Sequence, residues 1–448
     1  MANFSKSNAP RFSVDVYQNE YLPEGGREVN AIVTVTATGG GTVGTAVTAP
    51  HLYTSGQGPA AAVAVMVDCS GSMDYPPTKM RGARDATSAA IDALRDGTHF
   101  AVIGGTHVAK EVYPGGGRLA VADATTREQA KLALRKLNAG GGTAIGTWLR
   151  LADRLLSSAD VAIRHGILLT DGRNEHESPE DLRTALDTCA GRFTCDARGV
   201  GTDWEVKEVT AISSALLGTA DIVADPDGLA ADFTRMMETA MGKEVADVAL
   251  RLWTPAGATV KFVKQVAPAV AELTGRRTEA TARAGDYPTG SWGDESRDYH
   301  VCVEVSPAGL GQEMLAARVS LVVPRPDGSA HSLGAQGLVR AVWTDDLTAS
   351  TSINPQVAHY TGQAELAQVI QQGLELRKSG DVDGATAKLG RAVQLAGSSG
   401  NADTAKLLAK VVDVVDAAAG TVRLKAKVEE ADEMTLETRS TKTVRVKK

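Results

Sequence analysis

The feature that most constrains the fold is an apolar run that ends abruptly in small polar residues. Residues 61–67 read AAVAVMV, and the polar stretch DCSGS follows at 68–72. A run of this length, with turn residues at its end and helical spacing from residue 79, predicts a strand buried inside a parallel sheet. Open α/β sheets bind ligands beyond the carboxyl ends of their strands. Asp68, Ser70 and Ser72 are therefore predicted to lie at a ligand-binding edge.

The chemistry of these three side chains suits a hard cation. They alternate along a loop rich in serine and glycine, so a tight turn can direct all three toward one point. Carboxylate and hydroxyl oxygens are the donors that Mg²⁺ prefers. The same residue types also fill ordinary turns, so this spacing alone does not establish a site.

The spacing D-x-S-x-S after an apolar strand resembles the metal-ion-dependent adhesion site of von Willebrand factor A domains. Two further parts of that pattern occur in the same order. The sequence GGT at 141–143, before a predicted helix, resembles the threonine loop, and LLTDG at 168–172 resembles the second aspartate loop. The metal ligands that the resemblance implies are Asp68, Ser70, Ser72, Thr143 and Asp171.

The resemblance also implies what this site binds. Family members hold a divalent ion through the hydroxyl groups, while the aspartates act directly or through water. This implies Mg²⁺ here, and Mn²⁺ or Ca²⁺ also suit oxygen donors. An Asp or Glu of a protein partner then replaces one water on the ion. The alternative is that the three loops only shape turns, which requires them to gather their oxygens at one edge by coincidence.

Two neighbouring stretches receive no role from the sequence. The stretch NEHE at 174–177 follows Asp171 and either tunes ion binding or forms a solvated approach to a helix that begins at Pro179. The stretch GVGTD at 199–203 ends another predicted strand with a loop at the same edge of the sheet.

Residues 60–243 alternate between apolar runs and amphipathic stretches, which indicates a mostly parallel sheet with helices on both faces. Strands are predicted at 61–67, 100–104, 107–113, 163–169, 194–200 and 220–224, and helices at 79–95, 126–137, 144–157, 179–190, 204–217 and 227–241. The predicted fold is a doubly wound, Rossmann-like α/β domain. Its order and length resemble a complete von Willebrand factor A domain at 56–244.

The segments on either side of this domain predict a second, antiparallel one. Residues 12–38 alternate as a β-hairpin within an N-terminal region 1–55, and a glycine- and threonine-rich linker follows at 39–58. Two strands are not stable alone in water, and strand patterns return at 245–343. Residues 1–55 and 245–345 are thus predicted to form one β-sandwich into which the α/β domain is inserted.

The C-terminal part is predicted to be helical at 346–420 and a charged, basic-ended tail at 421–448. The stretch 374–396 resembles a single tetratricopeptide-like hairpin, whereas a repeat array needs several copies. The tail is expected to be solvated and flexible. The alternative is a phosphorylation or docking segment that uses Thr435, Thr438, Thr441 and Thr443.

Composition argues against several functions. The net charge is −7 and aromatic residues make up 4%, neither of which suits binding to nucleic acid or acidic membranes. No apolar run approaches the ~20 residues of a membrane helix, and the first residues lack the apolar segment of a secretion signal. Four cysteines in 448 residues fit a reducing compartment. We expect a soluble, cytoplasmic protein.

The sequence carries no recognisable catalytic motif. It lacks G-x-x-x-x-G-K-[ST] and H-E-x-x-H, and Ser70 lies in DCSGS rather than in G-x-S-x-G. A metal ion can activate water for hydrolysis, but no candidate base is evident beside the site. We therefore expect the protein not to be an enzyme.

The hairpin, the WTDD turn at 343–346 and the basic, threonine-containing tail, taken with the α/β domain, resemble a bacterial family of cytoplasmic von Willebrand A proteins. The family is associated with serine/threonine kinases, PP2C-type phosphatases and forkhead-associated (FHA) proteins. The resemblance implies a Mg²⁺-dependent interaction scaffold in signalling or stress response. The alternative is an adaptor that recruits substrates to an AAA+ ATPase of the MoxR or chelatase type.

Overall fold

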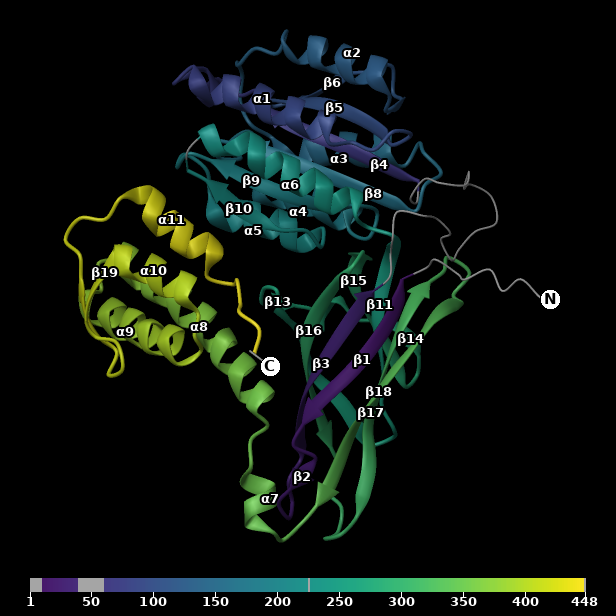
Figure 1. Ribbon diagram of the computed structural model, residues 1–448, viewed down its shortest axis with the longest axis vertical. Helices are drawn as coiled ribbons and strands as arrows, with labels where there is room; N and C mark the ends of the chain where they lie inside the picture. The colour runs from purple at the N-terminus through teal and green to yellow at the C-terminus, as the bar shows by residue number, and fades with distance from the viewer. Residues whose placement is uncertain (1–9, 39–59, 225, 447–448) are drawn as a thin grey trace. The chain divides into compact units, whose positions relative to one another are not determined.

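The computed structural model describes residues 10–38, 60–224 and 226–446 (Figure 1). The described chain divides into two compact units. Of the described residues, the first unit contains 10, 60–224, 226–246 and 290–293, and the second contains 11–38, 247–289 and 294–446. The linker predicted at 39–58 lies outside the described residues.

The first unit is built on a seven-stranded sheet in the order β10-β9-β8-β4-β5-β6, with β7 paired to β5. Its strands are β4 (Ala61–Asp68), β5 (His99–Gly105), β6 (Ala109–Tyr113), β7 (Ala120–Val121), β8 (Ile163–Thr170), β9 (Thr194–Val200) and β10 (Ala220–Val223). Strands β10, β9, β8, β4 and β5 are parallel to one another, whereas β6 and β7 run antiparallel to β5. Every residue of β4 is buried, as its unbroken apolar run predicts.

Two groups of helices cover this sheet. The helices are α1 (Thr78–Asp92), α2 (Ala124–Leu134), α3 (Ile145–Leu156), α4 (Pro179–Cys189), α5 (Val206–Ala215) and α6 (Leu229–Met241), with short 3₁₀ turns η1 (Gly71–Asp74) and η2 (Pro226–Gly228). Helix α1 packs with α2 and α6, and the alternate β4 residues Val63, Val65 and Val67 share their core. Helix α3 packs with α4 and contacts β4, β5 and β8. The predicted doubly wound α/β fold is confirmed.

Two further large sheets lie mostly in the second unit. One has the order β1-β3-β16-β12-β13, and the other has the order β14-β15-β11-β17-β18-β2. Their strands are β1 (Arg11–Gln18), β2 (Tyr21–Leu22), β3 (Glu28–Thr38), β11 (Val245–Trp253), β12 (Ala258–Ala267), β13 (Ala271–Glu272), β14 (Thr278–Thr281), β15 (Ala284–Trp292), β16 (Glu295–Val305), β17 (Glu313–Pro324) and β18 (Ala330–Trp343), with a 3₁₀ turn η3 (Thr274–Arg276).

The N-terminal hairpin completes one of these sheets. Strand β3 pairs antiparallel with β16, so that Val33 lies opposite Tyr299, and both side chains are fully buried. The second sheet packs on the hairpin, because a β-carbon on Gly337 of β18 would lie 2.6 Å from Val16 and 2.8 Å from Val14. In the chain, the α/β unit therefore lies between β3 and β11, which are strands of these two sheets.

The C-terminal part differs from the prediction at its end. Helices α7 (Leu347–Thr351), α8 (Pro355–Lys378), α9 (Val382–Ser398) and α10 (Ala402–Val411) occupy the predicted helical region. A hairpin of β19 (Val412–Asp416) and β20 (Thr421–Leu424) and a final helix α11 (Glu430–Arg439) follow. The prediction of a flexible tail at 421–448 is thus wrong for the described residues, which reach 446.

Burial and ion pairing explain why α11 is folded. Leu436 is 0% exposed, and Arg377 of α8 pairs with Glu433 at 2.8 Å. The charges that suggest a solvated tail therefore lie beside an apolar stripe that packs inward. The hydroxyls of Thr438 and Thr443 donate to backbone carbonyls at 2.7 and 2.6 Å, so the proposed modification of these residues requires them to leave these contacts.

No helix in the described ranges combines the length and apolar character that a membrane crossing requires.

Candidate metal centre

The predicted metal ligands lie where two central strands end. Asp68 is the last residue of β4, and Asp171 directly follows β8. These strands are parallel neighbours in register, with Val67 opposite Leu169, so their carboxyl ends bring both aspartates to one edge of the sheet. The chain continues from β4 toward β5 on one side, while β8 lies on the other, which makes this edge a topological switch point.

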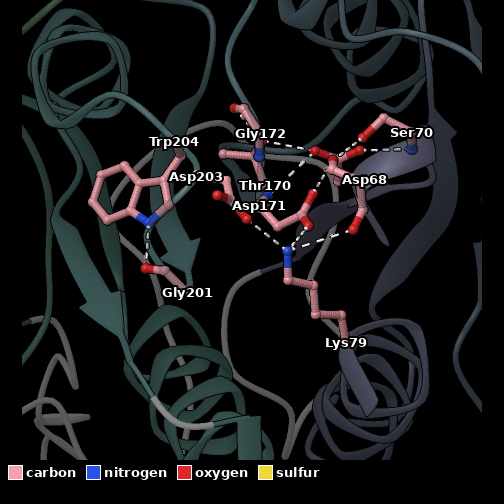
Figure 2. A network of polar contacts seen from close by, with 10 residues as sticks. Asp68, Ser70, Lys79, Thr170, Asp171, Gly172, Gly201, Asp203 and Trp204 are labelled. Atoms are coloured by element: carbon pink, nitrogen blue, oxygen red, sulfur yellow. Dashed lines mark hydrogen bonds and ion pairs between the residues drawn. The ribbon is translucent and has the colours of Figure 1, made fainter. Parts of the chain in front are cut away.

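Hydrogen bonds connect the two aspartates through the serine loop (Figure 2). The backbone N–H of Ser70 donates to Asp68 Oδ1 at 2.8 Å, and the hydroxyls of Ser70 and Ser72 lie 3.0 Å apart. The Ser72 hydroxyl donates to Asp171 Oδ1 at 2.7 Å. On its other oxygen, Asp68 accepts a bond from the hydroxyl of Thr170 at 2.7 Å.

Thr143 joins this group from the third loop. A β-carbon on Gly172 would lie 3.1 Å from Ser72 Oγ, 3.6 Å from Thr143 Oγ1 and 3.9 Å from Ser70 Oγ. The three hydroxyl oxygens therefore surround one small space that stays open because residue 172 has no side chain. All five predicted ligands are brought together: Asp68, Ser70, Ser72, Thr143 and Asp171.

The site contains negative charge that the protein buries. Asp68 and Asp171 are both 0% exposed. The pKa of Asp68 is raised from 3.8 to about 6, mainly by burial and also by the charge of Asp171, while hydrogen bonds from Ser70 and Thr170 oppose the shift. A bound cation stabilises the ionised form of such a buried carboxylate.

The donor set fits a hard divalent cation. It offers two carboxylates and three hydroxyls, which are the oxygen donors of Mg²⁺ sites. Among the described residues, no group of three or more His, Cys, Asp or Glu side chains is placed to hold a metal ion. The donors here therefore favour Mg²⁺-type chemistry over a histidine- or cysteine-rich transition-metal site.

The stretch at 174–177, to which the sequence assigns no role, holds the threonine loop in place. Helix α3 has Ala144 at its N-cap, which offers no side-chain acceptor. Asn174 Oδ1 accepts from the N–H of Ile145, Glu177 Oε2 accepts from Gly146, and His176 Nδ1 accepts from Thr143, at 2.8, 2.8 and 3.2 Å. The chain after Asp171 thus caps α3 and fixes Thr143 beside the aspartates.

Replacing Asn174 by alanine removes the acceptor for the N–H of Ile145. We expect a loss of about 1 kcal/mol in unfolding free energy, as for other lost helix caps. We also expect roughly 3- to 10-fold weaker Mn²⁺ binding, because a support of the threonine loop is gone. Urea unfolding and calorimetric titration measure the two effects. Glu175→Ala, at an exposed neighbour, is the control, and equal behaviour of both variants would contradict this role.

Lys79 is also part of this site, although nothing in the sequence indicates it. It lies in the first turn of α1, its side chain is 9% exposed, and its ammonium lies 2.8 Å from Asp171 Oδ2 and 3.0 Å from Asp203 Oδ2 (Figure 2). Its position near a helix start gives no local signal of this contact. The loop predicted at 199–203 does reach the site, through Asp203.

Comparisons with known proteins agree with this architecture. A family model described as von Willebrand factor type A domain matches residues 61–222, and one described as von Willebrand factor type A C-terminal domain matches 394–440. A solved structure named von Willebrand factor type A from Catenulispora acidiphila is 52% identical, covers 99% of each chain and has a TM-score of 0.90. No curated protein matches the sequence.

Two more distant structures share the fold alone. The ArnB paralog VWA2 from Sulfolobus acidocaldarius is 15% identical, with 96% of this chain and 98% of that chain covered and a TM-score of 0.57. The human COPII-coat protein Sec24c is 10% identical, with 86% of this chain and 57% of that chain covered and a TM-score of 0.51.

Proposed function

Because the chain belongs to the von Willebrand factor type A family, we propose that it binds Mg²⁺ at a metal-ion-dependent adhesion site and, through that ion, a carboxylate of a protein partner. The observation that carries this proposal is the convergence of three hydroxyls and two fully buried carboxylates at one edge of the sheet. Mn²⁺ is a suitable substitute in the same oxygen site.

The proposed ligands supply two kinds of oxygen donor to such a site. Ser70, Ser72 and Thr143 supply neutral oxygens, and Asp68 and Asp171 supply charge. A bound Mg²⁺ supplies a positive centre that keeps exchangeable coordination positions for an Asp or Glu of the partner. The three hydroxyl donors are neutral and compensate none of the ion's charge, so only Asp68, Asp171 and the partner's carboxylate can do so.

Exposed apolar side chains near the site are suited to contact the same partner. Tyr75, which follows η1 in the loop after β4, is 82% exposed, and Val108, in the turn after β5, is 44% exposed. Both loops leave the carboxyl ends of strands that neighbour each other in the sheet. Aromatic and apolar anchors beside a central polar contact are typical of binding hot spots.

We place this activity in the cytoplasm, in a non-enzymatic scaffold for bacterial signalling or stress response. A serine/threonine kinase, a PP2C-type phosphatase or an FHA-domain protein is the expected partner. The family resemblance of the sequence supports this setting. Recruitment by an AAA+ ATPase is the competing outcome of the experiment below.

The test is affinity capture with the full-length protein in Mg²⁺ and in EDTA, using wild type, Asp171→Asn and Asp160→Asn. Asp160 is an exposed carboxylate before β8 and serves as the control. We expect a partner that wild type and Asp160→Asn retain in Mg²⁺ and that Asp171→Asn loses. A partner retained equally in EDTA would contradict the proposal, and co-captured ATPase rings would favour the adaptor function.

A further inference from the structure

The ammonium group of Lys79 occupies the space between the metal centre and the β9–α5 loop. It is bonded to Asp171 Oδ2 at 2.8 Å and to Asp203 Oδ2 at 3.0 Å, and it lies 3.4 Å from the carbonyl oxygen of Ser72 (Figure 2). The Asp171 side chain is 0% exposed, whereas that of Asp203 is 66% exposed. Lys79 thus joins a buried ligand carboxylate to a solvated one.

Both oxygens of Asp171 are already engaged in this arrangement. Oδ1 accepts from the Ser72 hydroxyl at 2.7 Å, and Oδ2 accepts from Lys79. Lys79 forms ion pairs with both aspartates, at 2.8 and 3.0 Å, which stabilise its charged ammonium form. A divalent cation at Asp171 must therefore share this carboxylate with a fixed positive charge, and the two cations repel each other.

The loop that carries Asp203 is held in place by its own contacts. Gly201 has a φ of +70°, which favours glycine, and its carbonyl accepts from the indole N–H of Trp204 at 3.0 Å. Trp204 is 2% exposed. Asp203 is therefore a positioned second partner for Lys79, beside the first.

We propose that Lys79 is a built-in counter-ion of the metal centre, which weakens the binding of the divalent ion alone and strengthens the binding of ion and partner carboxylate together. This inference rests on the proposed function and concerns the balance of charge at its metal site. Among the buried groups, ionised Asp68 and Asp171, charged Lys79 and a bound divalent ion have charges that sum to +1, and a partner carboxylate brings this sum to zero. The carboxylate of Asp203 is left out of the sum because it is 66% exposed and its charge is screened by water. Without Lys79, the site with its bound ion already has no net charge, so it attracts a partner carboxylate less strongly.

Asp203 has a defined part in this balance. When an ion binds to Asp171, the ammonium group of Lys79 still has Asp203 as a partner at 3.0 Å. It therefore stays in place and is not left as an unpaired buried charge. Asp203→Asn should thus weaken ion binding when Lys79 is present and weaken it less when Lys79 is replaced. A double-mutant cycle measures this difference.

The experiment measures Mn²⁺ binding by electron paramagnetic resonance, with and without acetate as the carboxylate probe, on the full-length protein. The variants are Lys79→Met, Lys79→Gln and Lys79→Arg. The control is Lys131→Met, which removes the ion pairs of Lys131 with Asp92 and Glu128. We expect Lys79→Met to bind Mn²⁺ about tenfold more tightly or better. We expect acetate to tighten Mn²⁺ binding in the wild type but not in Lys79→Met.

Each outcome has a distinct meaning. Lys79→Arg keeps the charge and should stay within about threefold of wild type, as should Lys131→Met. If wild type binds Mn²⁺ but neither Lys79→Met nor Lys79→Gln, each checked for folding by circular dichroism, binds it more tightly, the counter-ion proposal is overturned and the metal site stands. If wild type itself binds no Mn²⁺, both proposals fail.

Discussion

Asp68→Asn is expected to weaken Mn²⁺ or Mg²⁺ binding by about a hundredfold or more, equivalent to ~2.7 kcal/mol, while the sheet stays folded. The side chain is fully buried at the end of β4, so its charge is poorly screened by water and acts strongly on an ion nearby. Asparagine keeps the shape and can still accept a bond from the N–H of Ser70. The change thus removes the charge and one acceptor, the oxygen bonded by the Thr170 hydroxyl.

Isothermal titration calorimetry measures this loss, with Asp160→Asn as a carboxylate control of equal charge change at an exposed position. A variant that binds within about threefold of wild type would show that the buried carboxylate is not part of an ion site.

The same substitution should remove a pH effect in the metal-free protein. The folded-state pKa of Asp68 is about 6, above its ordinary 3.8, so the folded protein takes up a proton more readily than the unfolded chain. Ionised Asp68 therefore costs folding free energy above pH 6, and the cost, up to about 3 kcal/mol, disappears as pH falls toward 4. Calorimetry in EDTA at pH 5 and pH 7.5 should show wild type gaining more stability on acidification than Asp68→Asn. Parallel behaviour of the two would contradict the assignment.

Leu436→Ala is expected to destabilise the second unit by about 2–4 kcal/mol. Leu436 is 0% exposed in α11 and packs in one cluster with Ile370 of α8, Leu389 of α9 and Leu408 of α10. Removing its side chain leaves a cavity among these four helices. This effect would not occur in a solvated tail.

Chemical unfolding of the full-length protein measures the loss in unfolding free energy, which is taken from the transition of the second unit. The matched control is Leu347→Ala, because Leu347 is 74% exposed and its removal should change stability by less than about 0.5 kcal/mol. Equal, small effects from both variants would mean that α11 does not pack on the other helices.

The fold of the first unit follows from its sequence because local signals agree there. The run at 61–67 is apolar at every position and ends in turn residues, so a buried parallel strand is the consistent interpretation. The proposed ligands stand directly after strands or before a helix, and parallel topology then brings them together without further information. Asp68, Ser70, Ser72, Thr143 and Asp171 could therefore be predicted as one site.

The supports of that site could not be predicted in the same way. Lys79 meets Asp171 across 92 residues, and Asn174 caps a helix 29 residues before it. Neither contact leaves a local pattern, although the absence of a capping residue at Ala144 was a usable hint that another loop must serve α3. Such contacts are decided by tertiary structure, which propensity and spacing do not describe.

Two other segments are also determined by tertiary structure. Strand β15 reads AGDYPTGSW, with two glycines and a proline, and it exists because it is a neighbour of β11 and β14 in the sheet. The C-terminal charges at 429–437 suggested solvent, but Glu433 and Glu437 pair with Arg377 and Lys378 of α8. In both segments the partner, rather than the segment itself, determines the structure.

The pairing of β3 with β16 sets the order in which a nascent chain can reach its native state. Thr36 bonds to Ser296, 260 residues later, so a ribosome that adds roughly 5–20 residues per second takes roughly 13 to 50 seconds to deliver that strand. The inserted unit emerges during this interval and has time to fold first. Until then the edge of β3 that β16 will occupy lacks its partner strand, and an unpaired strand edge is a template for wrong pairing.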